Sequence, residues 1–237
     1  YKRQPKYRYQ LWDLGEYEDL TEIDESKVHE ISIIFGDYNT SDDMDGECTT
    51  PMESGETENC TVGDYMTHPA FLSIPSTGFW VGKFETGTTL SSEYNVRNGD
   101  AIQIKPNISS WRNIQVGNAF YTSYDYKRDL ESHMMKNTEW GAVAYLQHSA
   151  YGCQESVRIN NSQSYFTGTA SNTEPTCGYT GTNEECNKYC YDRTCNIAYP
   201  NSVLASTTGN ISGIYDMSGG AWEYVMGVMV DQNGNPM

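Results

Sequence analysis

The sequence has few aliphatic side chains, few basic residues and no long apolar run. Leucine, isoleucine and valine are scarce, whereas the 237 residues include 19 Tyr, 5 Trp and 21 Gly. Because a buried aromatic ring covers roughly 150–250 Å², we expect rings to supply much of the buried area. The length is sufficient for a genuine core, in one large domain or two small ones.

The shortage of positive charge argues against nucleic acid as a partner. Fifteen Lys and Arg stand against 32 Asp and Glu, a formal net charge of −17, whereas binding to DNA, RNA or anionic membranes needs clustered Lys and Arg. The first eight residues are basic, but residues 13–64 are crowded with acidic groups. Such a charge run is typical of a solvent-facing surface, and a cation site is the sharper alternative.

The sequence also lacks the features of membrane insertion. No apolar run approaches the ~20 residues of a membrane span, so we expect no direct insertion by this segment. No signal peptide precedes Tyr1. For an exported protein, we expect the targeting segment to have been removed or to lie upstream.

Cysteine is present, but in none of the usual zinc-binding spacings. No CxxC pair occurs, so disulfides in an oxidising environment are favoured over a structural zinc. Cys48 with Cys60, which would close a small acidic loop, is the pairing we expect first. The pairing of the other five stays open, and an odd count leaves one cysteine unpaired. The seven candidates are Cys48, Cys60, Cys153, Cys177, Cys186, Cys190 and Cys195.

Strand patterns dominate the first part of the chain. Alternation predicts strands over 7–14 and 27–36, and bulky residues on both faces of 79–87 predict a central strand. Residues 37–68 are polar, punctuated by glycine and acidic, which indicates a long surface insertion. A short strand is expected just before Pro106. In the second strand, inward-facing residues are expected at Val28, Ile31, Ile33 and Phe35.

Helical patterns follow in the middle of the chain. We expect helices over 111–124, over the short stretch 129–135 and over 138–149, with Thr138 as the N-cap of the last. Residues 152–200 are rich in Asn, Ser, Thr, Gly and Cys, which is typical of loops. The order of elements predicts an α+β fold with much irregular structure. In the last helix, a buried stripe is expected at Trp140, Val143, Ala144 and Leu146.

No catalytic constellation is visible. The sequence has no GxSxG nucleophile elbow, no HExxH and no phosphate-binding glycine loop. Glu131 and Glu139 flank His133, but carboxylates in a helical stretch are more often solvated or capping than catalytic. We therefore expect a protein that is not an enzyme. Each of the four histidines, His29, His68, His133 and His148, is interpreted as an isolated surface or half-buried residue.

Four segments in order carry a family resemblance: GFWVGKFETG, SSWRNIQVGNAF, NTEWGAVAYL and GIYDMSGGAWEYV. They resemble the characteristic motifs of the formylglycine-generating-enzyme/sulfatase-modifying-factor superfamily, over roughly residues 70–226. The wording of these segments is closer still to pilin-like cell-surface proteins of Firmicutes that carry this module. The last motif is the most specific of the four.

The resemblance implies a C-type-lectin-like α+β fold, with two helices packed on a small twisted antiparallel sheet and long disulfide-tied loops. Residues 70–237 would form this core, C-terminally incomplete. Residues 1–69 would add N-terminal strands and the acidic insertion to the same domain. By the same analogy, the protein is extracellular, displayed at the cell surface, with a membrane or pilus anchor upstream of Tyr1.

The enzymatic activities of the resembling family do not carry over. Its copper-dependent oxidases use a cysteine pair after an RGGSW segment, since soft thiolates suit Cu(I). This sequence has neither that segment nor a cysteine after the tryptophan motif. Its iron-dependent relatives need an HxxxHxE set, which is missing as well.

The resemblance also implies a calcium site in SGGAWEY, residues 218–224. Its ligands would be the Glu223 carboxylate and backbone carbonyls around Gly220 and Ala221, with Trp222 packed beneath. Calcium takes six to eight hard oxygens, and glycine lets carbonyls converge. Gly220 stands where the family usually has Asn, which removes one ligand. No other cofactor is expected.

A second interpretation of the same stretch needs no metal. Asp216 and Glu223 would hydrogen-bond the backbone of a fixed turn, while Tyr215, Trp222 and Val225 fill the core. Two other acidic stretches, 37–47 and 231–236, are interpreted as polar turns. The first resembles an EF-hand loop but has an aspartate where glycine is required.

These patterns predict a non-catalytic extracellular recognition or adhesion module on a bacterial surface or pilus-like appendage. Its partner would be a glycan or protein of a host or neighbouring cell. One alternative is a structural subunit of a pilus or surface filament, assembled from copies of itself. Another is an oxidoreductase related to the formylglycine-generating enzyme. Fold analogy alone supports any of them weakly, because this scaffold hosts unrelated activities.

Overall fold

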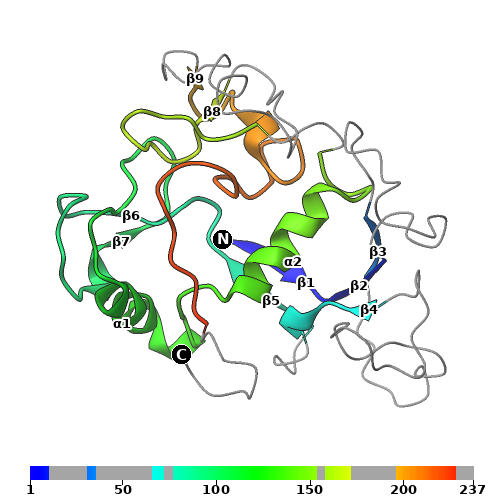
Figure 1. Ribbon diagram of the computed structural model, residues 1–237, viewed down its shortest axis with the longest axis horizontal. Coiled ribbons are helices and arrows are strands. Elements are labelled where there is room, and N and C mark those ends of the chain that lie inside the picture. The colour runs from blue at the N-terminus through cyan, green and yellow to red at the C-terminus, as the bar shows by residue number, and fades with distance from the viewer. Residues whose placement is uncertain (11–30, 36–65, 72–76, 154–157, 172–195, 228–237) are drawn as a thin grey trace, which may run out of the picture.

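Short strands and two helices are joined by long irregular segments (Figure 1). The computed structural model describes residues 1–10, 31–35, 66–71, 77–153, 158–171 and 196–227. In these residues the helices are α1 (Val116–Tyr126) and α2 (Asn137–Gln147). The strands are β1 (Lys2–Pro5), β2 (Tyr7–Gln10), β3 (Ser32–Phe35), β4 (Met66–Thr67), β5 (Gly78–Val81), β6 (Gly87–Thr88), β7 (Ile102–Gln103), β8 (Ala170–Ser171) and β9 (Asn196–Ile197).

The described strands form small antiparallel sheets. β1 pairs with β5, β2 lies between β3 and β4, β6 pairs with β7, and β8 pairs with β9. The predicted mixed α+β class with two helices and small antiparallel sheets is therefore confirmed. None of the helices in the described ranges is long and apolar enough to cross a bilayer.

The strand predicted over 79–87 is shorter and less central than expected. β5 ends at Val81 and, among the described residues, pairs with β1 alone. Its Trp80 is 70% exposed. The chain then leaves the sheet and re-enters regular pairing only at β6. Bulky residues on both faces of β5 thus reflect a strand that turns one aromatic face outward, not one buried on both sides.

Aromatic rings build the core around the N-terminal sheet, as the composition predicts. Tyr7 of β2 is fully buried and meets Phe71 edge-on at a centroid distance of 5.3 Å. Its hydroxyl donates a hydrogen bond to the carbonyl of Ala142 in α2, at 2.8 Å. The cluster consists of Tyr7, Tyr9, Ile31, Ile33, Ala70, Phe71 and Ala142.

The surface insertion predicted over 37–68 ends earlier than expected. Met66–Thr67 form β4 on the N-terminal sheet, and His68 is buried between the rings of Tyr7, Tyr9 and Tyr145. Burial lowers the pKa of His68 to about 4. An uncharged His68 is therefore part of the aromatic core. The prediction for 37–65 lies outside the described residues.

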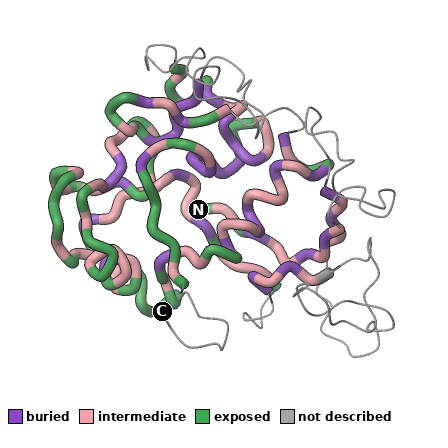
Figure 2. The backbone as a smooth tube through the Cα atoms, in the orientation of Figure 1, coloured by how far each residue is buried: buried purple, intermediate pink, exposed green. Residues whose placement is uncertain are grey.

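α2 connects two clusters of the core. Ala142 belongs to the first, while its neighbour Val143 packs with Val81, Ile214 and Met217 in the second. Trp140, Ala144 and Leu146 pack at the margins, so the predicted stripe is confirmed in outline. Thr138 is not the N-cap: the helix begins at Asn137, and Lys136 takes the cap position. Figure 2 shows the buried backbone along α2 and the N-terminal strands.

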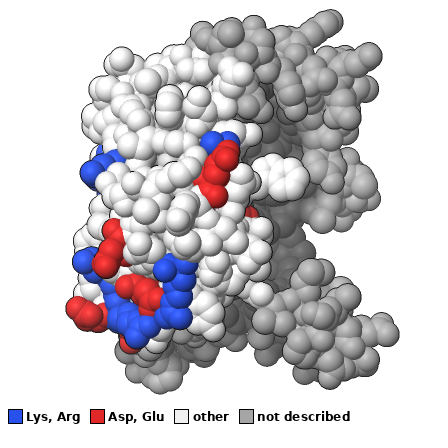
Figure 3. Space-filling model, turned by 90° about the vertical axis from the view of Figure 1, so that its left-hand side faces the viewer, with Lys and Arg blue, Asp and Glu red and all other residues white. Residues whose placement is uncertain are grey.

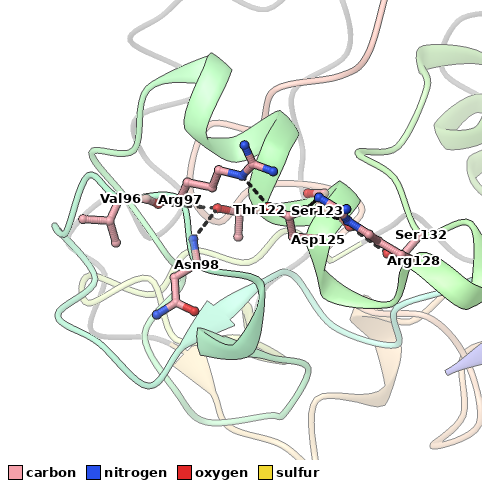
Figure 4. A network of polar contacts seen from close by, with 8 residues as sticks. All are labelled: Val96, Arg97, Asn98, Thr122, Ser123, Asp125, Arg128 and Ser132. Carbon is pink, nitrogen blue, oxygen red and sulfur yellow. Dashed lines mark hydrogen bonds and ion pairs between the residues drawn. The ribbon is translucent and has the colours of Figure 1, made fainter.

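α1 begins at Val116, five residues later than its predicted start at 111. Asn95 holds that beginning, because its side-chain oxygen accepts a hydrogen bond from the Gln115 backbone N–H at 2.8 Å. At the other end, Asp125 receives hydrogen bonds from both Arg97 and Arg128 (Figure 4). These arginines hold the pKa of Asp125 at about 2. α1 is thereby tied to the preceding loop.

The helix predicted over 129–135 is wrong. Only Arg128–Leu130 forms a single 3-10 turn, and Glu131 ends it in a left-handed conformation with φ of 54°. The following residues run extended toward α2. Figure 3 shows the α1 side of the molecule, where basic and acidic side chains gather low in the view and most of the remaining described surface is uncharged.

A Tyr7→Phe substitution tests the aromatic core. It removes only the hydroxyl, leaving the Ala142 carbonyl without its buried donor, so the free energy of unfolding should fall by about 1–2 kcal/mol. Urea denaturation followed by circular dichroism measures the change. Tyr94→Phe, at an exposed position, is the matched control and should change the midpoint little. Equal effects at the two positions would contradict this view of the core.

Candidate ligand-binding cavity

An open cavity of about 1530 Å³ lies beside β5 and α1. Its walls come from β5, the segment joining α1 to α2, and residues 214–226. Four of the five tryptophans of the chain line it: Trp80, Trp111, Trp140 and Trp222. Its volume exceeds the roughly 300–1,000 Å³ of a typical small-molecule site, so it has room for a short chain of sugars or amino acids.

Asp216 organises one wall of this cavity from within. Its carboxylate, 4% exposed, accepts hydrogen bonds from the Gly168 N–H at 2.9 Å, the Asn160 side-chain amide at 2.8 Å and the Glu85 N–H at 3.1 Å. Burial raises the pKa of Asp216, while these donors oppose the rise. Both oxygens face donors only, so the arrangement suits the ionised form.

The glycines that follow Asp216 form a tight turn against Asn160. Gly219 and Gly220 have φ of 78° and 77°, a region that glycine adopts at little cost. The Asn160 N–H donates to the Ser218 carbonyl, and the Gly220 N–H donates to the Asn160 carbonyl, both at 2.8 Å. A Cβ at Gly220 would lie 2.7 Å from a carboxylate oxygen of Glu85. Conformation therefore favours glycine at both positions, and space requires it at Gly219, where a Cβ would lie 2.4 Å from the Asn160 carbonyl oxygen.

Glu85 is the carboxylate that this turn approaches. Its Oε2 accepts a hydrogen bond from the Ser110 hydroxyl at 2.7 Å and a long one from the Ala221 N–H at 3.5 Å. Burial, followed by the charge of Glu223, raises the pKa of Glu85 to about 8. Near neutral pH this carboxyl group is therefore largely protonated.

Glu223 follows the glycine turn in the chain and lines the same cavity as Glu85. Loss of hydration between the cavity walls, followed by the charge of Asp216, raises the pKa of Glu223 to about 7. The side chain is nevertheless exposed to water that enters the open cavity. Solvent therefore screens its charge, and we assign it no contribution to stability.

The described residues do not complete the calcium shell that the resemblance implies. The backbone group of Ala221 directed at the nearest carboxylate is an N–H, not a carbonyl. In the part of the chain that the structure describes, no three His, Cys, Asp or Glu side chains come together as a metal-binding group. Calcium at Glu223, Gly220 and Ala221 stays a prediction from the resemblance.

The second interpretation of the tryptophan motif holds for its first half only. Asp216 does bind backbone N–H groups of a fixed turn, and Tyr215 is buried against Phe84. Trp222 and Val225, however, are exposed, and Trp222 projects fully into solvent. The chain leaves the core at Ala221, so the residues that follow line the cavity instead of filling the interior.

Cys153 is the one cysteine within the described residues, and it is a buried free thiol. It fits the place of the unpaired cysteine that an odd total requires. The other six, including the pair Cys48 and Cys60, lie outside the described residues, so the disulfides stay predictions.

A second titratable pair lines the same cavity. The Nε2 of His133 lies 3.0 Å from Oε1 of Glu139, and its Nδ1 lies 2.9 Å from the Glu131 carbonyl oxygen. Both partners are acceptors, so a doubly protonated ring satisfies both. The bond to Glu139 raises the pKa of His133. Burial would raise the pKa of Glu139, but the donors His133 and Lys136 lower it.

The His133–Glu139 pair corrects the interpretation of His133 as an isolated residue, whereas Glu139 caps α2, one of the two roles expected for it. Glu139 is buried at the start of α2, where it also accepts the Lys136 N–H at 2.8 Å. Lys136 in turn bridges to Met226, whose N–H donates to the Met135 carbonyl at 2.7 Å. The pair thus supports the strand-like segment that carries Trp222 and Glu223.

Sequence reasoning missed Glu85, Ser110 and Asn160. Glu85 stands in the segment GKFETG, where a lone acidic residue among aromatic neighbours is a usable sign of a buried carboxylate. Asn160 lies in loop sequence rich in similar residues, and nothing in its surroundings distinguishes it.

Comparison with known proteins adds no family: no protein-family model matches the chain, and the search of curated proteins gives no match. The resemblance to the formylglycine-generating-enzyme superfamily therefore stays a prediction from the four motifs.

A Glu85→Gln substitution tests the buried carboxylate. The raised pKa means that the folded state binds a proton that the unfolded state releases above about pH 4.5. Stability contributed by protonated Glu85 is therefore lost as pH rises toward 8. Gln should stabilise the protein at pH 8.5 by on the order of 1–2 kcal/mol and have little effect at pH 5. Urea denaturation at both pH values is the measurement, and a pH-independent difference would count against the assignment.

Titration of His133 by NMR tests the pair with Glu139. Its raised folded-state pKa predicts a midpoint above the ordinary value of about 6.5, and the matching stability is lost as pH rises through that midpoint. In Glu139→Gln the midpoint should fall toward or below the ordinary value. His68, with its lowered pKa, is the internal control and should stay neutral through this range. An unchanged His133 midpoint would show that Glu139 does not hold it.

Proposed function

We propose that this protein is a non-catalytic recognition or adhesion module of C-type-lectin-like fold, displayed outside a bacterial cell, and that its ligand binds in the tryptophan-lined cavity. The observation that carries the proposal is the concentration of four of the five tryptophans around one open cavity. Aromatic side chains give large contact areas at little entropic cost, and they dominate binding hot spots.

The exposure of these rings supports contact with a partner rather than packing in the core of this chain. Trp80 and Trp222 expose most of their surface, and Tyr224 exposes about half of its own, at 53%. Large apolar side chains grouped in the open mark interaction sites in soluble proteins. The scaffold beneath them is fixed by the buried hydrogen bonds of Asp216 and Asn160. The cavity thus combines a rigid wall with an exposed aromatic rim.

The residues of the tryptophan motif support a non-catalytic role in this proposal. The thiolate pair and the histidine set of the resembling oxidases are both missing from the tryptophan motif and its surroundings. We place the protein at the cell surface because the four motifs resemble pilin-like surface proteins of Firmicutes. The ligand would be a glycan or protein of a host or neighbouring cell.

Assembly into a filament is the second candidate, and the exposed rim of the cavity favours it. In a filament, Trp80 and Trp222 would be buried against the next copy of the chain. Sedimentation velocity separates the two functions: a monomer at about 100 µM supports a ligand-binding module, whereas concentration-dependent polymers lost in Trp222→Ala support a filament subunit.

Trp222→Ala tests the proposed function directly. Because the side chain is fully exposed, its removal should leave the thermal midpoint unchanged while weakening ligand binding by about tenfold or more. Binding is measured on a glycan array and to intact cells by flow cytometry. Tyr94→Ala, exposed and outside the cavity lining, is the matched control. Retained binding in Trp222→Ala would refute the assignment of the site.

A further inference from the structure

Three carboxyl groups line the wall of the cavity around the glycine turn. Glu85, Asp216 and Glu223 act on one another. Within the described residues, no ion pair joins any of them to a basic side chain. Where these carboxyl groups are ionised, their like charges repel one another, and a bound cation would relieve that repulsion.

The basic residues of the cavity lining are occupied elsewhere. The Arg112 guanidinium lies over the Tyr165 ring at 4.5 Å and 4.0 Å from Glu93. The Lys136 ammonium lies 3.7 Å from Glu139. Lys127 lies 5.7 Å from the ring of Tyr126. The cavity therefore has a paired side near α2 and an unpaired acidic side at the glycine turn.

Hydrogen-bonding capacity at the acidic side fits a donor-rich ligand. Oε2 of Glu85 is taken by Ser110 and Ala221, but its Oε1 accepts no hydrogen bond from the described residues. The same holds for the carboxylate of Glu223. Asp216 is saturated by protein N–H groups, so it acts through its charge alone. An ammonium or guanidinium group supplies only donors and suits these acceptors.

Exposed aromatic rings of the same cavity also suit a lysine or arginine side chain. Trp222 precedes Glu223 in the chain, Tyr224 follows it, and Trp80 stands on the same cavity. Lysine and arginine have long apolar stems that pack on aromatic surfaces while the charged head meets an aromatic face or a carboxylate. A neutral sugar would use the rings but gain nothing from the net charge. The volume of about 1530 Å³ also exceeds that of a single small amine.

We propose that the cavity binds a basic segment of a partner protein, with a lysine or arginine side chain between Glu85 and Glu223 and its stem against Trp222. This inference rests on the proposed function and names the ligand class for the same site. It selects a protein partner over a glycan.

Matched tripeptides are the probes: acetylated and amidated Gly-Lys-Gly, with acetyl-lysine and glutamate counterparts. Chemical-shift titration of the tryptophan indole signals at pH 8.5 reports binding. The lysine peptide should shift the Trp222 signal and bind at least about tenfold more tightly than acetyl-lysine. Equal binding of the two, or binding of neither, would overturn the proposal.

The double variant Glu85→Gln/Glu223→Gln supplies the decisive comparison. It should weaken lysine-peptide binding by about tenfold or more. The control is Asp100→Asn/Asp129→Asn, which removes the same charge from exposed positions outside the cavity. This control should change lysine-peptide binding by less than about twofold. Near-ultraviolet circular dichroism confirms that both variants are folded. Equal losses of peptide affinity in the two double variants would mean that the peptide is attracted only by the net charge of an acidic protein, which would contradict the proposal. Stoichiometric calcium binding that displaces the peptide would also contradict it, because the carboxylates would then be metal ligands.

Failure of this inference is distinguishable from failure of the proposed function. If Trp222→Ala abolishes binding to glycans or cells while the lysine peptide does not bind, the recognition module stands and its ligand is not cationic. If Trp222→Ala leaves cell and glycan binding intact, the cavity is not the recognition site and both proposals fall.

Discussion

The buried carboxylate of Asp216 is the interaction on which the cavity depends. It joins the chain after β5, through the Glu85 N–H, to the loop at residues 160–168 and to its own segment. These segments have little regular structure of their own. Instead of regular backbone pairing, buried hydroxyl groups donate hydrogen bonds to backbone carbonyls. Ser206 donates to the Val203 carbonyl and Thr167 to the Ile108 carbonyl. Buried polar groups of this kind fix a single arrangement only when each is satisfied.

This constraint explains why a rigid wall and an exposed rim meet at Ala221. Up to that residue the chain is held by Asp216, Asn160 and the glycine turn. Beyond it, the described chain touches the segment before α2 through Lys136 and Met226. Residues 222–225 are exposed (Figure 2) and line the open cavity. The acidic groups are thus positioned by the interior while the rings remain available to a ligand. The exposed residues proposed to contact a ligand therefore follow directly after the segment that the buried hydrogen bonds hold.

Much of the fold could be predicted from the sequence where periodicity was strong. Alternation located β2 and β3, and the pattern from Thr138 onward located the start of α2 to within one residue and its end to within two. The errors arose where local pattern and tertiary context disagree. Residues 129–135 have helical spacing, but the side chain of His133 is drawn to Glu139, and Glu131 adopts a left-handed conformation. Trp222 resembles a core residue by type, yet it follows a turn that directs the chain outward.

The candidate site was predicted in part, because its residues are distant in sequence. The tryptophan motif pointed to Asp216 and Glu223, but no spacing relates them to Glu85, more than a hundred residues earlier, or to Asn160 in an unpatterned loop. Only the fold brings a lone acidic residue of one motif against the glycines of another. Charge accumulation of this kind is a property of tertiary structure that composition does not show.

The most direct test of this account is the stability of Asp216→Asn, measured by urea denaturation beside the wild-type protein. Asparagine keeps the size and tolerates the positive φ of 63° at this position, but it turns an N–H donor toward other donors. We predict a loss on the order of 3 kcal/mol or more in the free energy of unfolding, together with altered tryptophan fluorescence as the wall of the cavity loosens. A variant with unchanged stability and fluorescence would contradict the claim that this carboxylate holds the site together.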